Sequence, residues 1–261
     1  MFRLIYFVII AATLIISGCG GTESIPEKGN TKNESFIKAK NLLLNQVYNN
    51  HRVTFYCGCN FTKNKKVRCK TGEGERARRI EWEHIVPASQ FGRTFDSWKK
   101  YTPLKCRIPS FIRKLFSIKC KVLGGRENAR RVSKLYRLME SDMYNLAPAI
   151  GLINQRRLNY PYRIIPGEKR EFGNCDFEVS KKTAEPSPHV RGDIARTYFY
   201  MNEVYPGRNI MSEAEKREFQ MWDKEDPVDE WECERCKKIE SLQGNINSFV
   251  KKPCQKKGFA F

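Results

Sequence analysis

This sequence lacks several features that would define common protein classes. It has no internal repeat at the period of a solenoid, which excludes a stacked repeat architecture. It has few acidic residues, with 29 Asp and Glu compared with 48 Lys and Arg. It also lacks a pair of well-formed zinc knuckles, because Cys57 and Cys59 are too close together and His51 is not at ligand spacing from them. A zinc domain built on cysteine pairs is therefore disfavoured.

The composition nevertheless describes a foldable and strongly basic chain. Its 261 residues are 40% hydrophobic, enough to bury a core in one sizeable domain or two small ones. The formal net charge of +19 attracts polyanions, because basic side chains release the counterions condensed around phosphates. Nucleic acid is therefore the favoured partner, and contact with a cell wall or a membrane surface is the alternative.

The N-terminus has the pattern of an export signal. Arg3 precedes an apolar run, Leu4–Ile16, and the small residues Ser17 and Gly18 follow before Cys19. The run is too short and too close to the terminus for a lasting membrane span. Residues 1–19 therefore predict a signal peptide, and the last four of them also resemble a bacterial lipoprotein box in which Cys19 would carry the lipid. An ordinary signal peptide with an incidental cysteine is the alternative.

Export decides how the remaining cysteines are interpreted. The predicted destinations are the periplasm, the outer membrane as a lipoprotein, or the medium. Of the ten cysteines, nine lie beyond Cys19, and in these oxidising compartments they predict up to four disulfides and one odd thiol. Residues 20–35 are mostly Gly, Ser, Thr, Asn, Glu and Lys, which predicts a flexible linker before the folded part of the chain.

Hydrophobic periodicity predicts one mixed α+β domain over residues 36–261, with more helix than strand. The expected helices span residues 33–48, 87–90, 130–142, 148–158, 194–205 and 213–223. The expected strands span residues 52–56, 79–83, 143–147 and 175–179. The tail after the last helix is expected to be short helix and coil held by a disulfide from Cys233 or Cys236 to Cys254.

Residues 93–119 differ in composition from the rest of the chain. They contain eight basic residues and a single acid, Asp96, with aromatic side chains between them. This composition predicts a loop or insertion lying over a basic groove. The alternative is a solvated surface loop that contacts nothing.

Only three histidines could act as a base, and one of them has a distinctive setting. His51 follows two asparagines in a turn and His189 lies in a Pro-rich loop, so both are expected at the surface. His84 follows Glu83 at the end of a strand, where a histidine can take a proton while the carboxylate binds a metal. Neighbours on a strand point to opposite faces, so both can reach one phosphate only if the chain bends, which Pro87 permits. A buried His–Glu contact without catalysis is the alternative.

A further polar residue lies on the helix expected after Pro148. This helix presents Asn154, whose amide oxygen is a neutral ligand that suits a hard cation such as Mg²⁺. One carboxylate and one amide leave most of an octahedron to water and phosphate oxygens, as Mg²⁺ prefers. An ordinary polar side chain on a helix face is the alternative.

Several groups of residues together resemble one known family. In chain order they are EWEHIVP at 81–87, GGR at 124–126, DMYNLAP at 142–148 with Asn154, and ARTYFYM at 195–201 with WECER at 231–235. The set resembles the bacterial endonuclease I family, which consists of periplasmic or secreted non-specific nucleases of the His-Me finger, or ββα-metal, superfamily. The matches span residues 36 to 254, so the resemblance implies that the whole domain is a nuclease with a ββα-metal core.

The resemblance also implies the roles of the central residues. Glu83 and Asn154 match the metal ligands, with Mg²⁺ as the expected ion and Mn²⁺ or Ca²⁺ able to take its place. His84 matches the general base, and Arg126 matches the arginine that holds the scissile phosphate. The implied reaction is hydrolysis of the phosphodiester bonds of DNA, leaving 5′-phosphate ends.

Three more residues are implied to support this site. Asn145 lies where related nucleases place an asparagine that orients the catalytic histidine, and Glu81 and Trp82 are expected behind the metal ligands and base. The implied protein is a monomer that contacts DNA through phosphate and sugar, which explains cutting with little sequence preference. Cleavage of RNA depends on tolerance of the 2′-hydroxyl.

The sequence departs from the family in three places. The segment between Gly92 and Cys120 is longer than usual and contains the basic stretch. Ala129 stands where the family has a cysteine paired with the one at Cys120, and the extra Cys106 could replace that partner. Cys236 is also extra and is the expected odd thiol. An alternative function is a surface lipoprotein that binds nucleic acid with an inactive site.

The excess of basic residues gives the first testable prediction. Binding to a polynucleotide should weaken by roughly a thousandfold between about 50 and 200 mM salt, because contacts to several phosphates release several counterions. Fluorescence anisotropy of labelled DNA in EDTA measures this binding without cleavage. A flat salt response would contradict recognition through phosphates.

Overall fold

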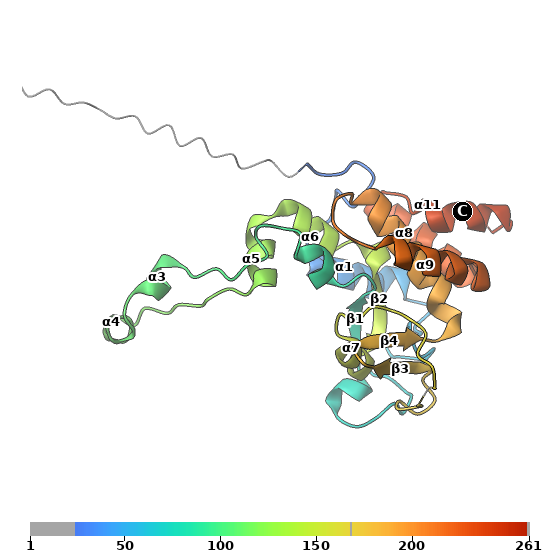
Figure 1. Cartoon of the computed structure of the whole chain (residues 1–261), viewed down its shortest axis with the longest axis horizontal. Coiled ribbons are helices and arrows are strands. Elements are labelled where there is room, and N and C mark those ends of the chain that lie inside the picture. Colours follow the sequence, from blue (N-terminus) through green and yellow to red (C-terminus); the bar gives the residue numbers. More distant parts are fainter. Residues whose placement is uncertain (1–23, 168, 260–261) are drawn as a thin grey trace, which may run out of the picture.

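The computed structural model describes residues 24–167 and 169–259. The predicted signal peptide, with Cys19, lies outside these residues. In the described ranges no helix combines the length and the apolar composition that crossing a bilayer requires. Figure 1 shows the elements gathered in one body, from which a long arm, residues 99–123, projects to one side.

A short antiparallel pair of strands and the helix that follows it form the centre of the fold. Strand β1 (Ile80–His84) pairs with β2 (Leu146–Ile150) along its whole length. All five residues of β2 are buried. Helix α7 (Gly151–Arg157) follows β2 directly and packs against both strands. This β1–β2–α7 unit agrees with the ββα core that the resemblance implies, and the predicted strand over residues 79–83 is confirmed.

Pro148 lies in the middle of β2, where the sequence predicted the start of a helix. That prediction is wrong, and so is most of the strand predicted over residues 143–147, because Met143–Asn145 form the 3-10 turn η3 and the helix begins only at Gly151. A proline lacks the N–H that a central strand needs, but in the described chain this sheet has only two strands. On its other side β2 has no paired strand in the described chain, and the carbonyl of Pro148 accepts there from the N–H of Phe55 at 2.8 Å. The missing N–H of the proline therefore interrupts no strand pairing.

The other elements are mostly helical, which confirms the predicted α+β class. A second antiparallel pair joins β3 (Phe177–Ser180) to β4 (Thr183–Pro186), close to the strand predicted over residues 175–179. The remaining α-helices are α1 (Phe36–Leu42), α2 (Ala88–Gly92), α3 (Leu104–Arg107), α4 (Ser110–Leu115), α5 (Gly125–Val132), α6 (Lys134–Glu140), α8 (Arg191–Val204), α9 (Glu213–Glu225), α10 (Glu230–Gln243) and α11 (Ser248–Lys256). The shorter helical segments are η1 (Leu43–Val47), η2 (Glu75–Arg78) and η4 (Pro188–Val190).

Helices α8 and α10 are tied together by a buried ion pair. Arg196 of α8 donates from Nε and Nη2 to the two carboxylate oxygens of Glu232 on α10, at 2.8 and 2.6 Å. Both side chains are almost fully buried, so water cannot replace either partner. Helix α10 is longer than the short helix and coil predicted for the tail. It runs from its N-cap Asp229 to Gly244, whose φ of +85° ends the helix.

A buried carboxylate joins η3 to the same helices. Asp142 accepts hydrogen bonds from the hydroxyls of Tyr200 and Tyr205, both at 2.7 Å, and from Gln243 Nε2 at 2.8 Å. It also caps η3 by accepting from the N–H of Tyr144 at 3.1 Å. Burial raises the pKa of Asp142, and these donors oppose the rise. The residue therefore holds α8, α10 and the start of η3 in one network.

The N-terminal helix confirms the predicted pattern of buried residues. Helix α1 begins after its N-cap Ser35, whose hydroxyl accepts from the N–H of Lys38 at 3.2 Å, and continues into η1. The recurrence of Phe36, Ala39, Leu43 and Val47 at helix spacing predicts one buried face. Ala39, Leu43 and Val47 are completely buried, and Phe36 is half-buried against the ring of His84.

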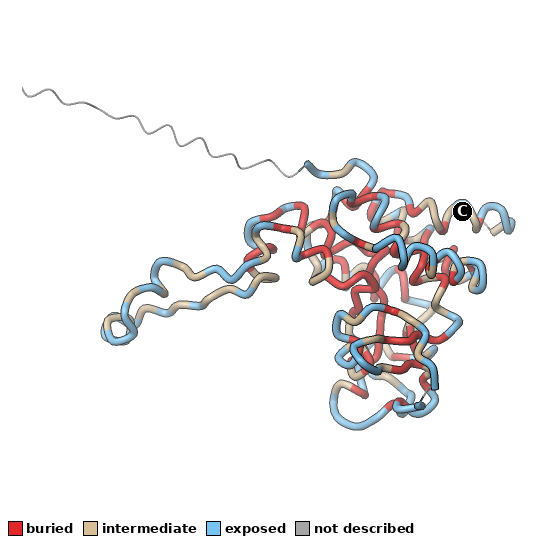
Figure 2. Tube along the Cα trace, in the orientation of Figure 1, coloured by how far each residue is buried: buried red, intermediate tan, exposed pale blue. Residues whose placement is uncertain are grey.

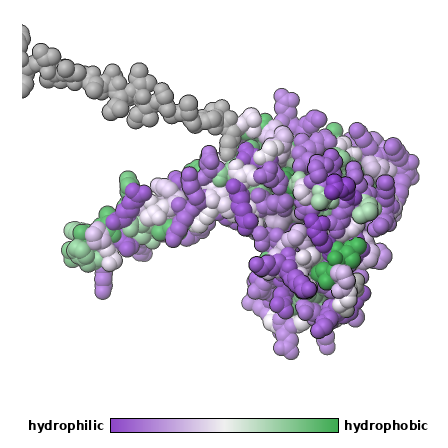
Figure 3. Space-filling view, viewed as in Figure 1, coloured by the Kyte–Doolittle hydropathy of each residue, from purple (hydrophilic) through white to green (hydrophobic). Residues whose placement is uncertain are grey.

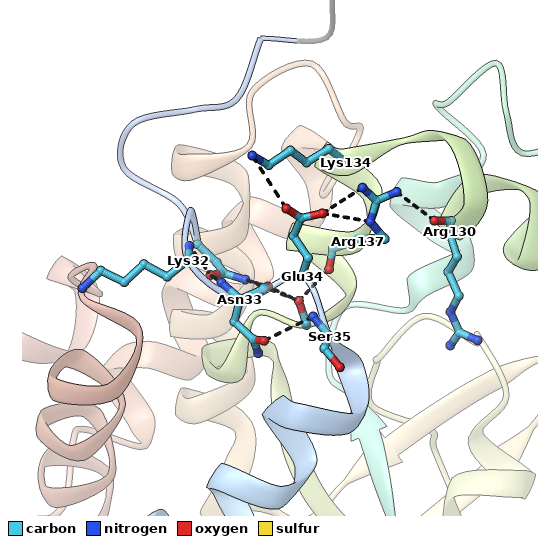
Figure 4. Close-up of polar contacts among 9 residues, drawn as sticks. Lys32, Asn33, Glu34, Ser35, Arg130, Lys134 and Arg137 are labelled. Carbon is cyan, nitrogen blue, oxygen red and sulfur yellow. Dashed lines mark hydrogen bonds and ion pairs between the residues drawn. The ribbon is translucent and has the colours of Figure 1, made fainter.

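Residues 30–35 belong to the folded body, so the flexible linker predicted through residue 35 is wrong at its C-terminal end. Asn30 is buried, and its side-chain nitrogen donates to the carbonyl of Asn33 at 2.7 Å. Glu34 pairs with Arg137 of α6 at 2.8 Å (Figure 4). The polar composition that suggested a tether supplies hydrogen-bonding groups that fasten this segment to the body.

The helix predicted over residues 130–142 is two helices. Helix α5 ends at Val132, and Ser133 caps α6 by accepting from the N–H of Tyr136 at 3.0 Å. The spacing of Val132, Leu135, Leu138 and Met139 predicts one apolar face for a single helix. Val132 is 52% exposed, so it does not share the buried face of the other three. A serine that accepts a backbone hydrogen bond starts a new helix here instead of continuing the old one.

The strand predicted over residues 52–56 is wrong. Within the described chain this segment makes only an isolated bridge, between Val53 and Asn60. The N–H of Cys59 bonds to the hydroxyl of Thr54 at 3.0 Å, so the chain turns back instead of continuing as a strand.

The basic segment forms most of the arm. Its two sides are joined by a bridge between Tyr101 and Leu123, and α3 and α4 lie towards its tip. The disulfide Cys106–Cys120 links the two sides further out. All residues of the arm are exposed or half-buried, and the arm points away from the body (Figure 2). The prediction that this segment lies over a basic groove is therefore wrong.

The cysteines form the predicted number of disulfides. The bonded pairs are Cys57–Cys175, Cys59–Cys69, Cys106–Cys120 and Cys233–Cys254. Cys236 is buried and is the one free cysteine in the described residues, as predicted. Cys120 bonds to Cys106, the residue that the resemblance suggested as its partner in place of a cysteine at position 129.

The network around Asp142 gives a prediction on stability. Asp142→Ala should lower the free energy of unfolding by about 3 kcal/mol or more, because it leaves several buried donors without an acceptor. Urea denaturation followed by circular dichroism measures this change. Glu213→Ala, at a side chain that is 81% exposed, is the control and should cost less than about 1 kcal/mol. A loss at Asp142 no larger than the control's would contradict the network's role.

Candidate active site

Four residues predicted from the sequence line a single cavity of about 330 Å³. Glu83 and His84 come from the end of β1, Asn154 from α7, and Arg126 from the first turn of α5. Trp82 forms part of the wall. The structure therefore brings together the predicted metal ligands, the predicted base and the predicted phosphate-binding arginine.

The ring of His84 is held in one orientation. Its Nε2 lies 2.9 Å from the backbone carbonyl of Glu140, and because a carbonyl only accepts, Nε2 carries the proton. The ring stacks on Phe36, with 5.0 Å between the ring centroids. Nδ1 is therefore the unprotonated nitrogen, with a lone pair available to accept a proton.

The surroundings of His84 keep its imidazole neutral. Burial and the positive charge of Arg126 together lower its pKa from 6.5 to about 4, and burial is the larger cause. The hydrogen bond to Glu140 opposes this change but does not reverse it. The ring is thus unprotonated at neutral pH, which is the state that a general base requires.

The carboxylate of Glu83 is anchored through one of its two oxygens. Oε1 accepts from the hydroxyl of Tyr56 at 2.9 Å and from Nη1 of Arg157 at 3.0 Å. Burial raises the pKa of Glu83, while Arg157 and Tyr56 oppose the rise. The backbone N–H of His84 also bonds to this carboxylate. Among the described residues no side chain donates to Oε2, so this oxygen is open to a cation.

The amide of Asn154 is oriented in the same manner. Its Nδ2 donates to Oε2 of Glu81 at 3.3 Å, which leaves Oδ1 without a donor among the described residues. Glu81 is in turn paired with Arg76 and Arg79 of the segment that leads into β1. Glu81 therefore lies behind the predicted metal ligand, where the resemblance placed it, and fixes which atom of the amide faces outward.

Arg126 is held by a buried carboxylate but keeps its outer nitrogens free. Its Nε donates to Oε1 of Glu140 at 2.6 Å, and Arg130 donates to the other oxygen of the same side chain. Burial alone would raise the pKa of Glu140, but these two guanidinium groups lower it, so Glu140 stays ionised. No described residue accepts from the Nη atoms of Arg126, whose side chain is 42% exposed. They are available to an anion at the mouth of the cavity.

Asn145 acts on the backbone beyond His84, whereas the resemblance implied that it orients the histidine. Its Oδ1 accepts from the N–H of Val86 at 2.7 Å, and its Nδ2 donates to the carbonyl of Val86 at 3.0 Å. Its own carbonyl accepts from the N–H of Ile85 at 3.1 Å. Any influence of Asn145 on His84 therefore passes through the chain, since the ring itself is held by Glu140.

Trp82 contributes to the wall without a polar contact. Its ring packs edge-on against Tyr48, with 5.8 Å between centroids. Its buried indole nitrogen has no hydrogen-bond partner in the described chain. The predicted supporting role is thus one of packing.

Sequence reasoning missed four residues that shape this cavity: Phe36, Tyr56, Glu140 and Arg157. One signal was available, because Arg157 lies three residues after Asn154 and so on the same side of α7. The other three reach the site only through the tertiary fold, and nothing in the local sequence marks them.

The donors present suit a hard divalent cation. Glu83 and Asn154 line the same cavity, and among the described residues no side chain donates to Oε2 of Glu83 or to Oδ1 of Asn154. Within residues 24–167 and 169–259 no three His, Cys, Asp or Glu side chains come together to hold a metal. The arrangement therefore fits an ion that takes few protein ligands and keeps most of its shell as water and substrate oxygens.

The site combines a histidine and a carboxylate at the end of one strand with an asparagine on the helix after the next strand, which is the arrangement that the resemblance implies for a ββα-metal nuclease. The sequence matches the family model described as Endonuclease I over residues 27–254. The chain belongs to the endonuclease I family, which confirms the resemblance and the predicted enzyme class.

The similar proteins that bear nuclease names align with most of the chain. An extracellular deoxyribonuclease of Aeromonas hydrophila is 37% identical over 81% of this chain and 86% of its own length. Endonuclease-1 of Buchnera aphidicola is 39% identical over 86% of this chain and 83% of its own. A periplasmic deoxyribonuclease of A. hydrophila is 36% identical over 80% of this chain and 83% of its own.

The environment of His84 gives a prediction that is independent of catalysis. In metal-free protein, NMR titration of its ring carbons should give a pKa near 4, well below the ordinary value of 6.5. His84→Ala removes the resonance and so assigns it. A pKa at or above 6.5 would show that the ring is not buried beside Arg126 as described.

Proposed function

We propose that this protein is an exported, Mg²⁺-dependent endonuclease that hydrolyses the phosphodiester bonds of DNA with little sequence preference. The observation that carries the proposal is the single cavity that is lined by Glu83, His84, Arg126 and Asn154. The relatives support DNA as the substrate, since they are named as deoxyribonucleases and endonucleases. Their extracellular or periplasmic names and the four disulfides support export.

The chemistry starts at Nδ1 of His84. This atom takes a proton from a water molecule, which attacks the phosphorus in line with the leaving 3′ oxygen. The Nη groups of Arg126 hold a non-bridging oxygen and balance the charge that develops on the phosphoryl group. Cleavage of the bond between phosphorus and the 3′ oxygen leaves a 3′-hydroxyl on one product and a 5′-phosphate on the other.

Glu83 and Asn154 would hold the metal ion through Oε2 and Oδ1. Mg²⁺ bound there supplies Lewis-acid stabilisation of negative charge on the leaving oxygen, and Mn²⁺ or Ca²⁺ can occupy the same oxygens. The hydrogen bonds from Arg157 to Glu83 and from Asn154 to Glu81 keep both ligand oxygens pointed inward before the ion arrives.

The substrate is recognised through its backbone. A surface with a formal net charge of +19 contacts phosphates, and such contacts position a duplex without reading its bases. RNA is a second substrate if the cavity admits the 2′-hydroxyl, which a cleavage assay on matched DNA and RNA strands decides. The protein acts as a monomer. A lipid on Cys19 would attach it to the outer membrane, and mass spectrometry of the mature N-terminus tests this.

Removal of the base gives the sharpest test of the mechanism. His84→Ala should reduce plasmid cleavage by at least about a hundredfold, because the attacking water loses its proton acceptor. DNA binding, measured by anisotropy, should stay within about twofold. His189→Ala, at an exposed histidine outside the cavity, is the matched control and should cleave like the wild type. Undiminished cleavage by His84→Ala would contradict the assignment.

Removal of the metal distinguishes a metal-dependent nuclease from a nucleic-acid-binding lipoprotein with an inactive site. Incubation with excess EDTA should abolish plasmid cleavage, and added Mg²⁺ should restore it, while the circular dichroism spectrum stays unchanged. Cleavage that survives EDTA would contradict metal dependence. DNA binding with no cleavage under any metal would instead identify a nucleic-acid-binding lipoprotein with an inactive site.

A further inference from the structure

The tip of the arm exposes large apolar side chains that no part of the body covers. Leu104 on α3 is 77% exposed, and on and after α4 Phe111, Leu115 and Phe116 are 71%, 76% and 68% exposed. Figure 3 shows these hydrophobic surfaces gathered at the end of the arm that lies farthest from the body. A soluble protein rarely exposes such a cluster unless it contacts an apolar partner.

The same arm is strongly cationic. Between Asp96 and Glu127 the chain has no acidic residue. Eight basic residues lie within the arm itself: Lys99, Lys100, Lys105, Arg107, Arg113, Lys114, Lys119 and Lys121. The partner that suits this surface therefore combines negative charge with an apolar layer beneath it.

A disulfide and a hydrogen bond within the arm hold the residues of its tip in fixed positions relative to one another. The disulfide Cys106–Cys120 joins its two sides, and Arg113 donates from Nε to the carbonyl of Ile108 at 2.9 Å. These contacts fix α4 relative to the segment before it. The apolar side chains are thus held facing solvent, so they lose little conformational entropy when they bind an apolar partner.

We propose that the tip of the arm docks onto the surface of an anionic phospholipid bilayer. Phe111, Leu115 and Phe116 enter the boundary between headgroups and acyl chains, while the lysines and arginines around them pair with lipid phosphates. An exported protein meets such surfaces in the cell envelope. A nucleic acid would satisfy the cations but offers nothing to the aliphatic side chains Leu104 and Leu115, so the composition of the tip favours lipid.

Docking through the tip leaves the cavity accessible. Trp98, which precedes the arm, lines the cavity, but no residue of the tip does. Arg126 follows directly after the arm and returns to the body. The proposed membrane contact is therefore separate from the nuclease site. It rests on the export of the protein but not on its proposed nuclease activity.

Vesicle co-sedimentation tests this proposal. The protein used is the chain from residue 20, which lacks the predicted signal peptide and Cys19 and retains every described residue. The probes are vesicles of phosphatidylglycerol with phosphatidylethanolamine, and neutral vesicles of phosphatidylcholine. A tip variant, Phe111→Ser with Leu115→Ser and Phe116→Ser, keeps all the charges. The control is Met221→Ser with Ile246→Ser, at residues that are 56% and 51% exposed on the body.

The expected results distinguish lipid from nucleic acid. Wild type and control should sediment with the anionic vesicles and not with the neutral ones, and the tip variant should bind them about tenfold more weakly or worse. Plasmid cleavage in the absence of vesicles should be equal in all three proteins, which shows that the tip variant is folded. Failure of the wild type to bind anionic vesicles, or equal binding by the tip variant, would overturn the proposal. A tip variant that keeps vesicle binding and loses affinity for DNA would identify the arm as a nucleic-acid contact.

Discussion

The guanidinium of Arg157 is buried inside the β1–β2–α7 unit, and the geometry of the site depends on its hydrogen bonds. From α7 it donates to Oε1 of Glu83 at 3.0 Å and to the carbonyls of His84 and Ile85 at 3.1 and 2.8 Å. It also lies over the ring of Tyr162, 4.3 Å from its centroid. One side chain thus fixes the helix that carries the amide ligand against the strand end that carries the carboxylate and the base. A buried charge of this kind requires its partners, so the two elements cannot separate cheaply.

Glu140 performs the corresponding task on the other side of the cavity. Its backbone carbonyl fixes the ring of His84, and its carboxylate holds Arg126 and Arg130. The base and the phosphate-binding cation are therefore positioned by the same residue at the end of α6. This arrangement also explains why the imidazole stays neutral, since the positive charge of Arg126 is held close to a buried ring.

Much of the site could be predicted from the sequence because its central residues lie in short motifs. The pair Glu83-His84 and the later Asn154 carried the chemistry, and the structure brings them into one cavity. Pro148 was predicted to start a helix but lies inside β2. A proline is tolerated there because the sheet has only two strands in the described chain, and no local sequence pattern reveals the number of strands. The prediction that residues 93–119 lie over a groove was wrong for a related reason. Charge and aromatic content indicate that a segment is at the surface, but they do not show whether it packs on the body or projects from it.

The central claim is that Oε2 of Glu83 and Oδ1 of Asn154 together hold one divalent ion beside Nδ1 of His84. Anomalous diffraction from crystals soaked in Mn²⁺ tests it most directly. The account predicts a single strong peak in the cavity, within about 2.5 Å of both oxygens, with the bond from Arg157 to Oε1 still in place. A peak at another location, or an empty cavity at a Mn²⁺ concentration that supports cleavage, would contradict it.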